Sequence, residues 1–192
     1  MKETNNKKPL IGPGWLRVLL FVLFFALLTL TVAIVAGLGV ALIKKEDIQK
    51  GKMPDVAALL KGELLWISTL LALVSSLLSV WLFRKMVDRK SILSLGLRWK
   101  NHGSDAASGF LLALVLAGLG SLVMYVTGHL RWTDMDFDPS SLFISLGIMV
   151  MVALGEEMVF RGYILSNLLT SFNKWVALSL SALLFTLAHL SN

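Results

Sequence analysis

Long apolar runs, separated by short polar segments, dominate the sequence after its first 14 residues. A helix needs about 20 apolar residues to cross the hydrocarbon core of a bilayer, and most of the runs reach that length. They extend approximately over residues 15–43, 64–83, 108–127, 141–172 and 175–190. The pattern predicts an all-α fold, a polytopic transmembrane helical bundle with about five membrane spans in this chain.

The segments between the runs predict the remaining organisation of the chain. Residues 1–14 are polar and contain two prolines, so we expect a disordered cytoplasmic leader there. Residues 15–140 then hold three membrane spans with their loops. In the connector 44–61, apolar residues recur at helical spacing after Pro54-Asp55, which predicts a short helix lying on the membrane.

Composition supports a membrane protein and indicates its orientation. Hydrophobic residues make up 56% of the chain, against roughly 45–50% in a soluble domain. The net charge of +6 comes from loops, where positive charge sets topology, so we expect no nucleic-acid partner. The lysine-containing leader and the basic loop 84–107 belong on one side and the acidic loop 128–140 on the other, which predicts a multi-pass protein of the cell membrane with a cytoplasmic N-terminus. Trp15 and Arg17 are expected to anchor the first span at the interface.

Three charged residues interrupt the fourth apolar run. Glu156, Glu157 and Arg161 lie where hydrocarbon is expected, and each charge near a bilayer centre costs about 2.5–3.5 kcal/mol on insertion scales. An intramembrane charge therefore marks a functional site by default. On an α-helix, Glu157 and Arg161 are four residues apart and form an ion pair inside the bundle, whereas Glu156 is rotated by about 100° and points elsewhere. The geometry predicts different roles for the two carboxylates.

The fifth run carries a histidine at a matching position. A turn near residues 172–173 predicts an antiparallel hairpin of the fourth and fifth spans, and Glu156 and His189 each lie 16 residues from it. Sixteen helical residues extend about 24 Å, so the two side chains are expected to face each other at the same depth. A carboxylate beside an imidazole can activate a water or hold a divalent cation. In the alternative interpretation, the Glu–Arg pair locks two helices and His189 is a hydrogen-bonded packing residue.

At these positions the sequence resembles the CPBP family of intramembrane proteases, also called the CAAX-protease and bacteriocin-processing, or Abi, family. Residues 156–161 match the family's EExxxR motif, and residues 185–189 match its FxxxH motif on the next membrane helix. The resemblance covers approximately residues 141–192, which we interpret as the N-terminal part of a CPBP-like catalytic domain.

The resemblance implies an intramembrane endopeptidase acting on membrane-tethered peptides or proteins, such as CAAX-type lipid-modified tails or bacteriocin-type leaders. Glu156 would be the general base that activates water. Glu157 and Arg161 would support and orient Glu156. His189 would bind the water, the oxyanion or a metal, with Phe185 as the supporting residue of the same motif.

A metal-dependent mechanism and a metal-free, glutamate-dependent mechanism are both open at this point. Zinc is possible, and a catalytic zinc takes three protein ligands and a water. Only Glu156, Glu157 and His189 lie at a plausible depth to supply them, because the chain has no cysteine and because His102 and His129 lie in loops. The family has a further histidine motif on a later helix, so we expect this chain to be a C-terminally truncated fragment that is incomplete for activity.

Two other functions compete with the protease. A non-catalytic immunity or scaffold protein could use the same bundle to bind a peptide. An ion- or proton-coupled transporter could use Glu156, Glu157 and His189 as a relay within the membrane. The transporter is less favoured because the chain shows no internal repeat.

Overall fold

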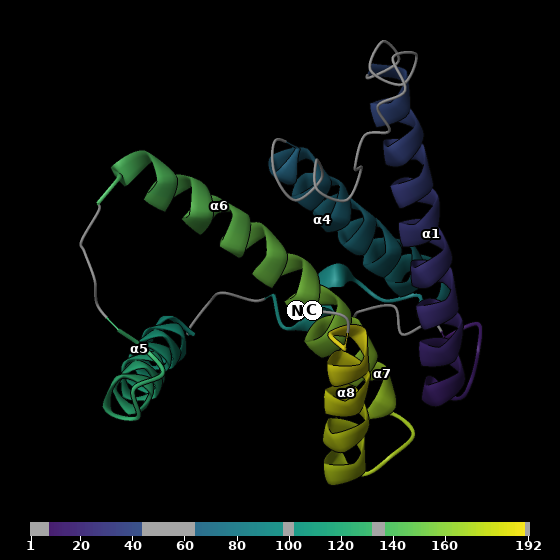
Figure 1. Cartoon of the computed structure of the whole chain (residues 1–192). Coiled ribbons are helices and arrows are strands. Elements are labelled where there is room, and N and C mark those ends of the chain that lie inside the picture. The colour runs from purple at the N-terminus through teal and green to yellow at the C-terminus, as the bar shows by residue number, and fades with distance from the viewer. Residues whose placement is uncertain (1–7, 44–63, 98–101, 132–136, 191–192) are drawn as a thin grey trace. The chain divides into compact units, whose positions relative to one another are not determined.

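The computed structural model describes residues 8–43, 64–97, 102–131 and 137–190. Within these ranges the chain is helical and forms no strand. In the part of the chain that the structure describes, four helices with their continuations are long and apolar enough to cross a membrane (Figure 1). They extend over Gly14–Leu42, Leu65–Val87, Gly103–Val126 and Pro139–Leu168. The predicted all-α membrane fold is confirmed.

The helical elements keep the labels of Figure 1. In chain order they are α1 (Gly14–Ile43), α4 (Leu65–Leu82), the π-helix η1 (Phe83–Val87), the 3₁₀ helix η2 (Ile92–Leu95), α5 (Gly103–Val126), α6 (Pro139–Glu156), the π-helix η3 (Glu157–Ile164), α7 (Leu165–Leu168) and α8 (Lys174–Ala188). The fifth predicted span corresponds to α8, an apolar helix of 15 residues. It extends about 22 Å, less than the roughly 30 Å of a hydrocarbon core.

Contacts divide the chain into two compact units. One comprises residues 1–96 and 144–192, and the other comprises residues 97–143. The second unit contains α5, on which no side chain is buried. A helix that is apolar over this length is suited to a lipid environment. The predicted domain boundaries, after residues 14 and 140, stay a prediction.

The core of the first unit lies where α1, α4, η3 and α8 meet. Phe21 of α1 and Tyr163 of η3 are fully buried, with ring centroids 4.3 Å apart. Phe83 meets both rings edge-on. The remaining buried apolar members of this cluster are Val18, Val80, Met158, Val159, Ile164, Leu168 and Ala177. The core therefore packs the start of α1 and the end of α4 against the helix that follows Glu156.

Small residues bring α6 close to α4. A Cβ added to Gly155 would lie 3.6 Å from the Cβ of Ser76, and one added to Gly147 would lie 2.8 Å from the ring of Trp66. Ser76 and Ser79 of α4 are themselves buried. Glycine and serine let helix backbones approach closely in a membrane, where van der Waals packing is a main source of helix association.

Three parts of the first unit lie at the same end of its helices. The amide of Leu10, before α1, donates a hydrogen bond to the carbonyl of Val87 at the end of η1 (2.8 Å). The amide of Gly14, at the start of α1, donates to Ser171 Oγ in the turn before α8 (2.8 Å). This agrees with placing the leader and the loop after the second span on one side of the membrane. Which side is cytoplasmic stays a prediction.

Two predictions concern segments that the structure describes only in part or not at all. The short helix in the connector 44–61 lies outside the described residues, as does part of the acidic loop 128–140. Of that loop, Asp138 accepts hydrogen bonds from the amides of Ser140 and Ser141 and from the Ser141 hydroxyl. These bonds lower the pKa of Asp138, and the bond from the Ser141 hydroxyl has the largest effect. Asp138 is therefore a capping residue at the start of α6.

Candidate active site

The helix that carries the charged motif changes type at that motif. The α-helical hydrogen bonding of α6 ends at Glu156, and residues 157–164 form the π-helix η3. Spacing alone predicts an uninterrupted α-helix here. Stretches of π-helix are rare and occur frequently at functional sites, so this local geometry is itself a mark of the site.

Glu157 and Arg161 form the predicted ion pair. Its surroundings differ from the prediction, because the two side chains are 53% and 62% exposed, with Arg161 the more exposed. The expectation that this pair is buried inside the bundle is wrong for the part of the chain that the structure describes. Arg161 also lies over the ring of Phe185, with the guanidinium carbon 5.9 Å from the ring centroid.

Glu156 and His189 meet across the hairpin, as counting residues from the turn predicts. His189 directly follows the last residue of α8, and its Nε2 lies 3.2 Å from Glu156 Oε1. Both side chains are about one-third exposed, at 32% for His189 and 35% for Glu156. The contact therefore joins residues 33 positions apart and remains open on one side.

The other ring nitrogen of His189 determines what Nε2 can do. Nδ1 lies 2.8 Å from the carbonyl oxygen of Phe185, which can only accept, so Nδ1 carries a hydrogen. A neutral imidazole then presents an Nε2 lone pair toward Glu156. The direct contact holds one proton, either on Nε2 or on the carboxyl group. Without that proton, two acceptors would face each other at 3.2 Å, and the direct hydrogen bond would be lost.

Phe185, the aromatic residue of the second motif, orients the histidine. Its ring stacks on the imidazole of His189, with centroids 4.4 Å apart. The ring of Phe160 meets it edge-on at 5.1 Å. Together with the bond from Nδ1 to its own backbone carbonyl, Phe185 fixes both the position and the tautomer of the imidazole.

Two grooves adjoin the charged residues. The first, of about 290 Å³, lies between α4 and α6, and its lining includes Glu156, Gly155, Ser76 and Thr69. The second, of about 370 Å³, lies between η3 and α8, and its lining includes Arg161. Glu156 and Arg161 thus line different grooves, and the division of roles between Glu156 and Glu157 stays a prediction.

The three predicted metal ligands do not gather in one place. Among the described residues, no three histidine, aspartate or glutamate side chains are grouped as metal ligands. Glu156 and His189 supply two donors, whereas Glu157 is engaged by Arg161. Since a catalytic zinc takes three protein ligands, these residues alone do not fit a zinc site. The other histidines of the chain have different partners, Asp105 for His102 and Thr127 for His129.

Comparison with known protein families agrees with the motifs. Residues 138–192 match the family described as Type II CAAX prenyl endopeptidase Rce1-like. This segment is Rce1-like. The predicted resemblance to the CPBP intramembrane proteases is confirmed for this segment, and the apolar helices of the chain indicate a membrane protein. No curated protein and no solved structure matches the chain.

The Rce1-like segment contains both elements of the candidate site. It begins at Asp138, the cap of α6, and includes η3, α7 and α8. Its two motifs therefore lie on the two arms of the hairpin, and the Glu156–His189 contact joins one motif to the other. The matched residues include none of α1, α4 or α5.

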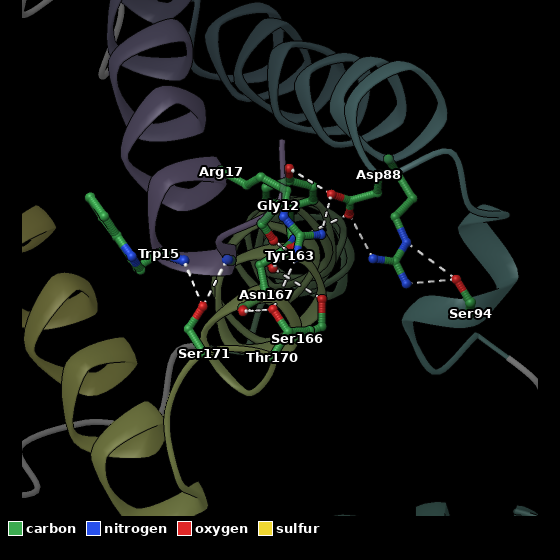
Figure 2. Close-up of polar contacts among 12 residues, drawn as sticks. Gly12, Trp15, Arg17, Asp88, Ser94, Tyr163, Ser166, Asn167, Thr170 and Ser171 are labelled. Atoms are coloured by element: carbon green, nitrogen blue, oxygen red, sulfur yellow. Dashed lines mark hydrogen bonds and ion pairs between the residues drawn. The ribbon is translucent and has the colours of Figure 1, made fainter. Parts of the chain in front are cut away.

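Sequence reasoning missed a second set of charged residues, centred on Asp88. Arg17, predicted to be an interfacial anchor, is only 3% exposed and donates to Asp88 Oδ1 at 3.0 Å. Arg84, interpreted as a topology-setting loop charge, is also buried and donates to Asp88 Oδ2 at 2.7 Å. Figure 2 shows Asp88 with Tyr163 and Asn167 of the Rce1-like segment close to it. Arg17 is therefore neutralised by a buried carboxylate, and its place at the membrane interface stays a prediction.

Part of this network is visible in the sequence. Arg84 and Asp88 are four residues apart, a spacing that favours an ion pair on a helix. Arg17 lies inside the first apolar run, where a charge calls for a partner. The identity of that partner is not readable, since Arg17 and Asp88 are 71 residues apart.

Proposed function

We propose that this protein is an intramembrane endopeptidase in which Glu156 activates the hydrolytic water. The observation that carries the proposal is the 3.2 Å contact between Glu156 and His189 within the segment that matches an endopeptidase family. Its substrates are membrane-tethered peptides, with lipid-modified CAAX-type tails the class that the family match favours.

The reaction begins with Glu156 ionised and His189 neutral. A water on the open side of the pair donates one hydrogen bond to the carboxylate and one to Nε2. Glu156 takes a proton from the water while the water oxygen bonds to the carbonyl carbon of the scissile peptide, and the C=O electron pair moves onto the carbonyl oxygen. When the C=O bond re-forms, the C–N bond breaks and the proton held by Glu156 passes to the leaving amine.

The remaining motif residues hold this arrangement in place. Phe185 keeps the Nε2 lone pair of His189 directed at Glu156, through the stacked ring and the carbonyl that Nδ1 contacts. Arg161 engages Glu157 and so leaves Glu156 free of a fixed cation. A general base needs that freedom, because a permanent ion pair would stabilise its ionised form and weaken it as a proton acceptor.

The experiment is cleavage of a prenylated C-terminal reporter peptide by the full-length protein in liposomes. Glu156→Gln keeps the shape of the side chain but cannot accept the proton, so kcat is expected to fall by about 100-fold or more. The kcat of His189→Gln is expected to fall by a similar factor. The exposed His129→Gln is a matched control and should cleave normally.

The result also separates the competing functions. Normal cleavage by Glu156→Gln refutes the assignment of the base. Reporter binding without cleavage by the unmodified protein favours a scaffold, and proton- or ion-dependent flux without cleavage favours a transporter.

A further inference from the structure

Asp88, at the end of the bundle where α1 begins, joins three parts of the chain. It is fully buried and accepts from Arg17 Nη1 of α1 at 3.0 Å and from Arg84 Nη1 of η1 at 2.7 Å. Asn167 Nδ2 of α7 donates to it at 3.2 Å, and the hydroxyl of Tyr163 of η3 does so at 3.4 Å (Figure 2). Four donors hold one buried carboxylate, so α1, the end of α4 and the helix beyond Glu156 are fastened together.

These contacts define the rotation of the helix that carries Glu156. Tyr163 lies seven residues after Glu156, within the π-helical stretch. Its ring is held between Phe21 and Phe83, and its hydroxyl contacts Asp88. Since π-helical turns are rare and short, contacts with neighbouring elements are needed to fix how such a segment is rotated.

The same network holds the turn that leads to His189. Arg17 Nη2 donates to Thr170 Oγ1 at 3.0 Å, and Ser171 Oγ accepts from the amide of Gly14 at 2.8 Å. Thr170 and Ser171 lie between α7 and α8. Both arms of the hairpin are therefore fixed at their common turn by the start of α1.

We propose that Asp88 is a positioning residue for the Glu156–His189 pair. It contacts neither side chain. It holds α4 and α1 against η3 and α7, so that the rotation of the helix brings the carboxylate of Glu156 to the imidazole. The catalytic consequence rests on the proposed function, whereas the geometric consequence can be measured without any cleavage.

A disulfide provides the geometric test. The chain has no cysteine, and the 3.6 Å between the Ser76 Cβ and a Cβ at Gly155 lies within the roughly 3.5–4.5 Å range of disulfides. S76C/G155C in the full-length protein, oxidised in membranes, is expected to cross-link α4 to α6 rapidly. Adding Asp88→Asn should slow the cross-linking several-fold. The matched control Asp105→Asn changes an exposed aspartate in the same way and should have no effect.

The kinetic test uses the same variants. Asp88→Asn is expected to lower kcat for the prenylated reporter by about tenfold to 100-fold, with KM within about twofold, because misplacement affects chemistry more than binding. Closing the S76C/G155C disulfide in this variant should restore much of the lost kcat, and reductant should remove the gain. A purely structural role would not be rescued by one cross-link.

Each outcome decides the proposal. If Asp88→Asn changes neither the cross-linking rate nor kcat, the proposal is overturned. It is also overturned if Asp88→Asn lowers kcat and the closed disulfide fails to restore it. If the unmodified protein cleaves nothing, the proposed function fails and the cross-linking rate alone decides the positioning role. If Asp88→Asn does not accumulate in membranes, Tyr163→Phe replaces it, since it removes one donor to Asp88 and keeps the buried ring. Unchanged cross-linking in Tyr163→Phe then overturns the proposal.

Discussion

Two sets of charged side chains interrupt the apolar helices of this protein, and the fold surrounds them differently. Asp88 is fully buried and has two arginines, an amide and a phenol as partners. Glu156 is about one-third exposed and has one described side-chain partner, His189. The contrast separates a fully satisfied carboxylate, which can only hold structure, from one with free lone pairs, which can bind and accept a proton.

The largest effect on stability is expected at the satisfied carboxylate. Asp88→Ala leaves two buried guanidinium groups without their anion, and breaking a buried ion pair in this way costs about 3–5 kcal/mol. The measurement is unfolding of the purified protein in detergent, with Glu156→Gln alongside. Equal destabilisation by the two variants would remove the distinction between the two sites.

A smaller but substantial effect is expected where α1 meets the turn before α8. A Cβ at Gly14 would collide with the carbonyl oxygen of Asn167 and with Thr170 Oγ1. Gly14→Ala is therefore expected to destabilise the fold by about 1–3 kcal/mol, the usual cost of overpacking. Gly12→Ala is the control, since nothing lies within 4 Å of its added Cβ. Similar unfolding of the two variants would contradict the close contact.

Arg161→Ala is expected to change stability by about 1 kcal/mol or less, because its pair with Glu157 is more than half exposed and exposed pairs contribute little. Its main effect should be on reporter cleavage, since Glu157 loses the cation that separates its role from that of Glu156. Unfolding and cleavage measured on one preparation distinguish the two. A loss of several kcal/mol would mean that the pair is buried in the membrane-embedded protein.

The smallest effect concerns Asp138 and depends on pH. Hydrogen bonds from Ser141 and Ser140 lower its pKa from the ordinary value of 3.8. A lowered pKa in the folded state means that the cap stabilises α6 fully above pH 3.8 and loses this effect as the pH falls through the lowered value. The protection factors of the amides in the first turn of α6, which correct for the intrinsic pH dependence of hydrogen exchange, should therefore fall at acid pH. In Asp138→Asn this acid-dependent step should disappear, and its persistence would assign the step to another group.

The depth match of Glu156 and His189 follows from counting helical residues, and the structure brings the two side chains together for that reason. The π-helix was not predictable, because a change from i→i+4 to i→i+5 bonding leaves no periodic mark over eight residues. The partners of Asp88 were not predictable either, since Arg17 and Asn167 lie 71 and 79 positions away along the chain. Sequence spacing therefore identifies residues that share a helix or a short hairpin, and it misses contacts between distant helices.

Because the hairpin is held at its turn, a small tilt there displaces its far end by a larger distance. Ser171 and Thr170 are tied to the start of α1, while His189 lies at the opposite tip of α8. Over the roughly 22 Å of that helix, a tilt of about 5° at the anchored end displaces the tip by about 2 Å. A small tilt at the base therefore changes the separation of His189 from Glu156, while every bond at the base of the hairpin stays intact.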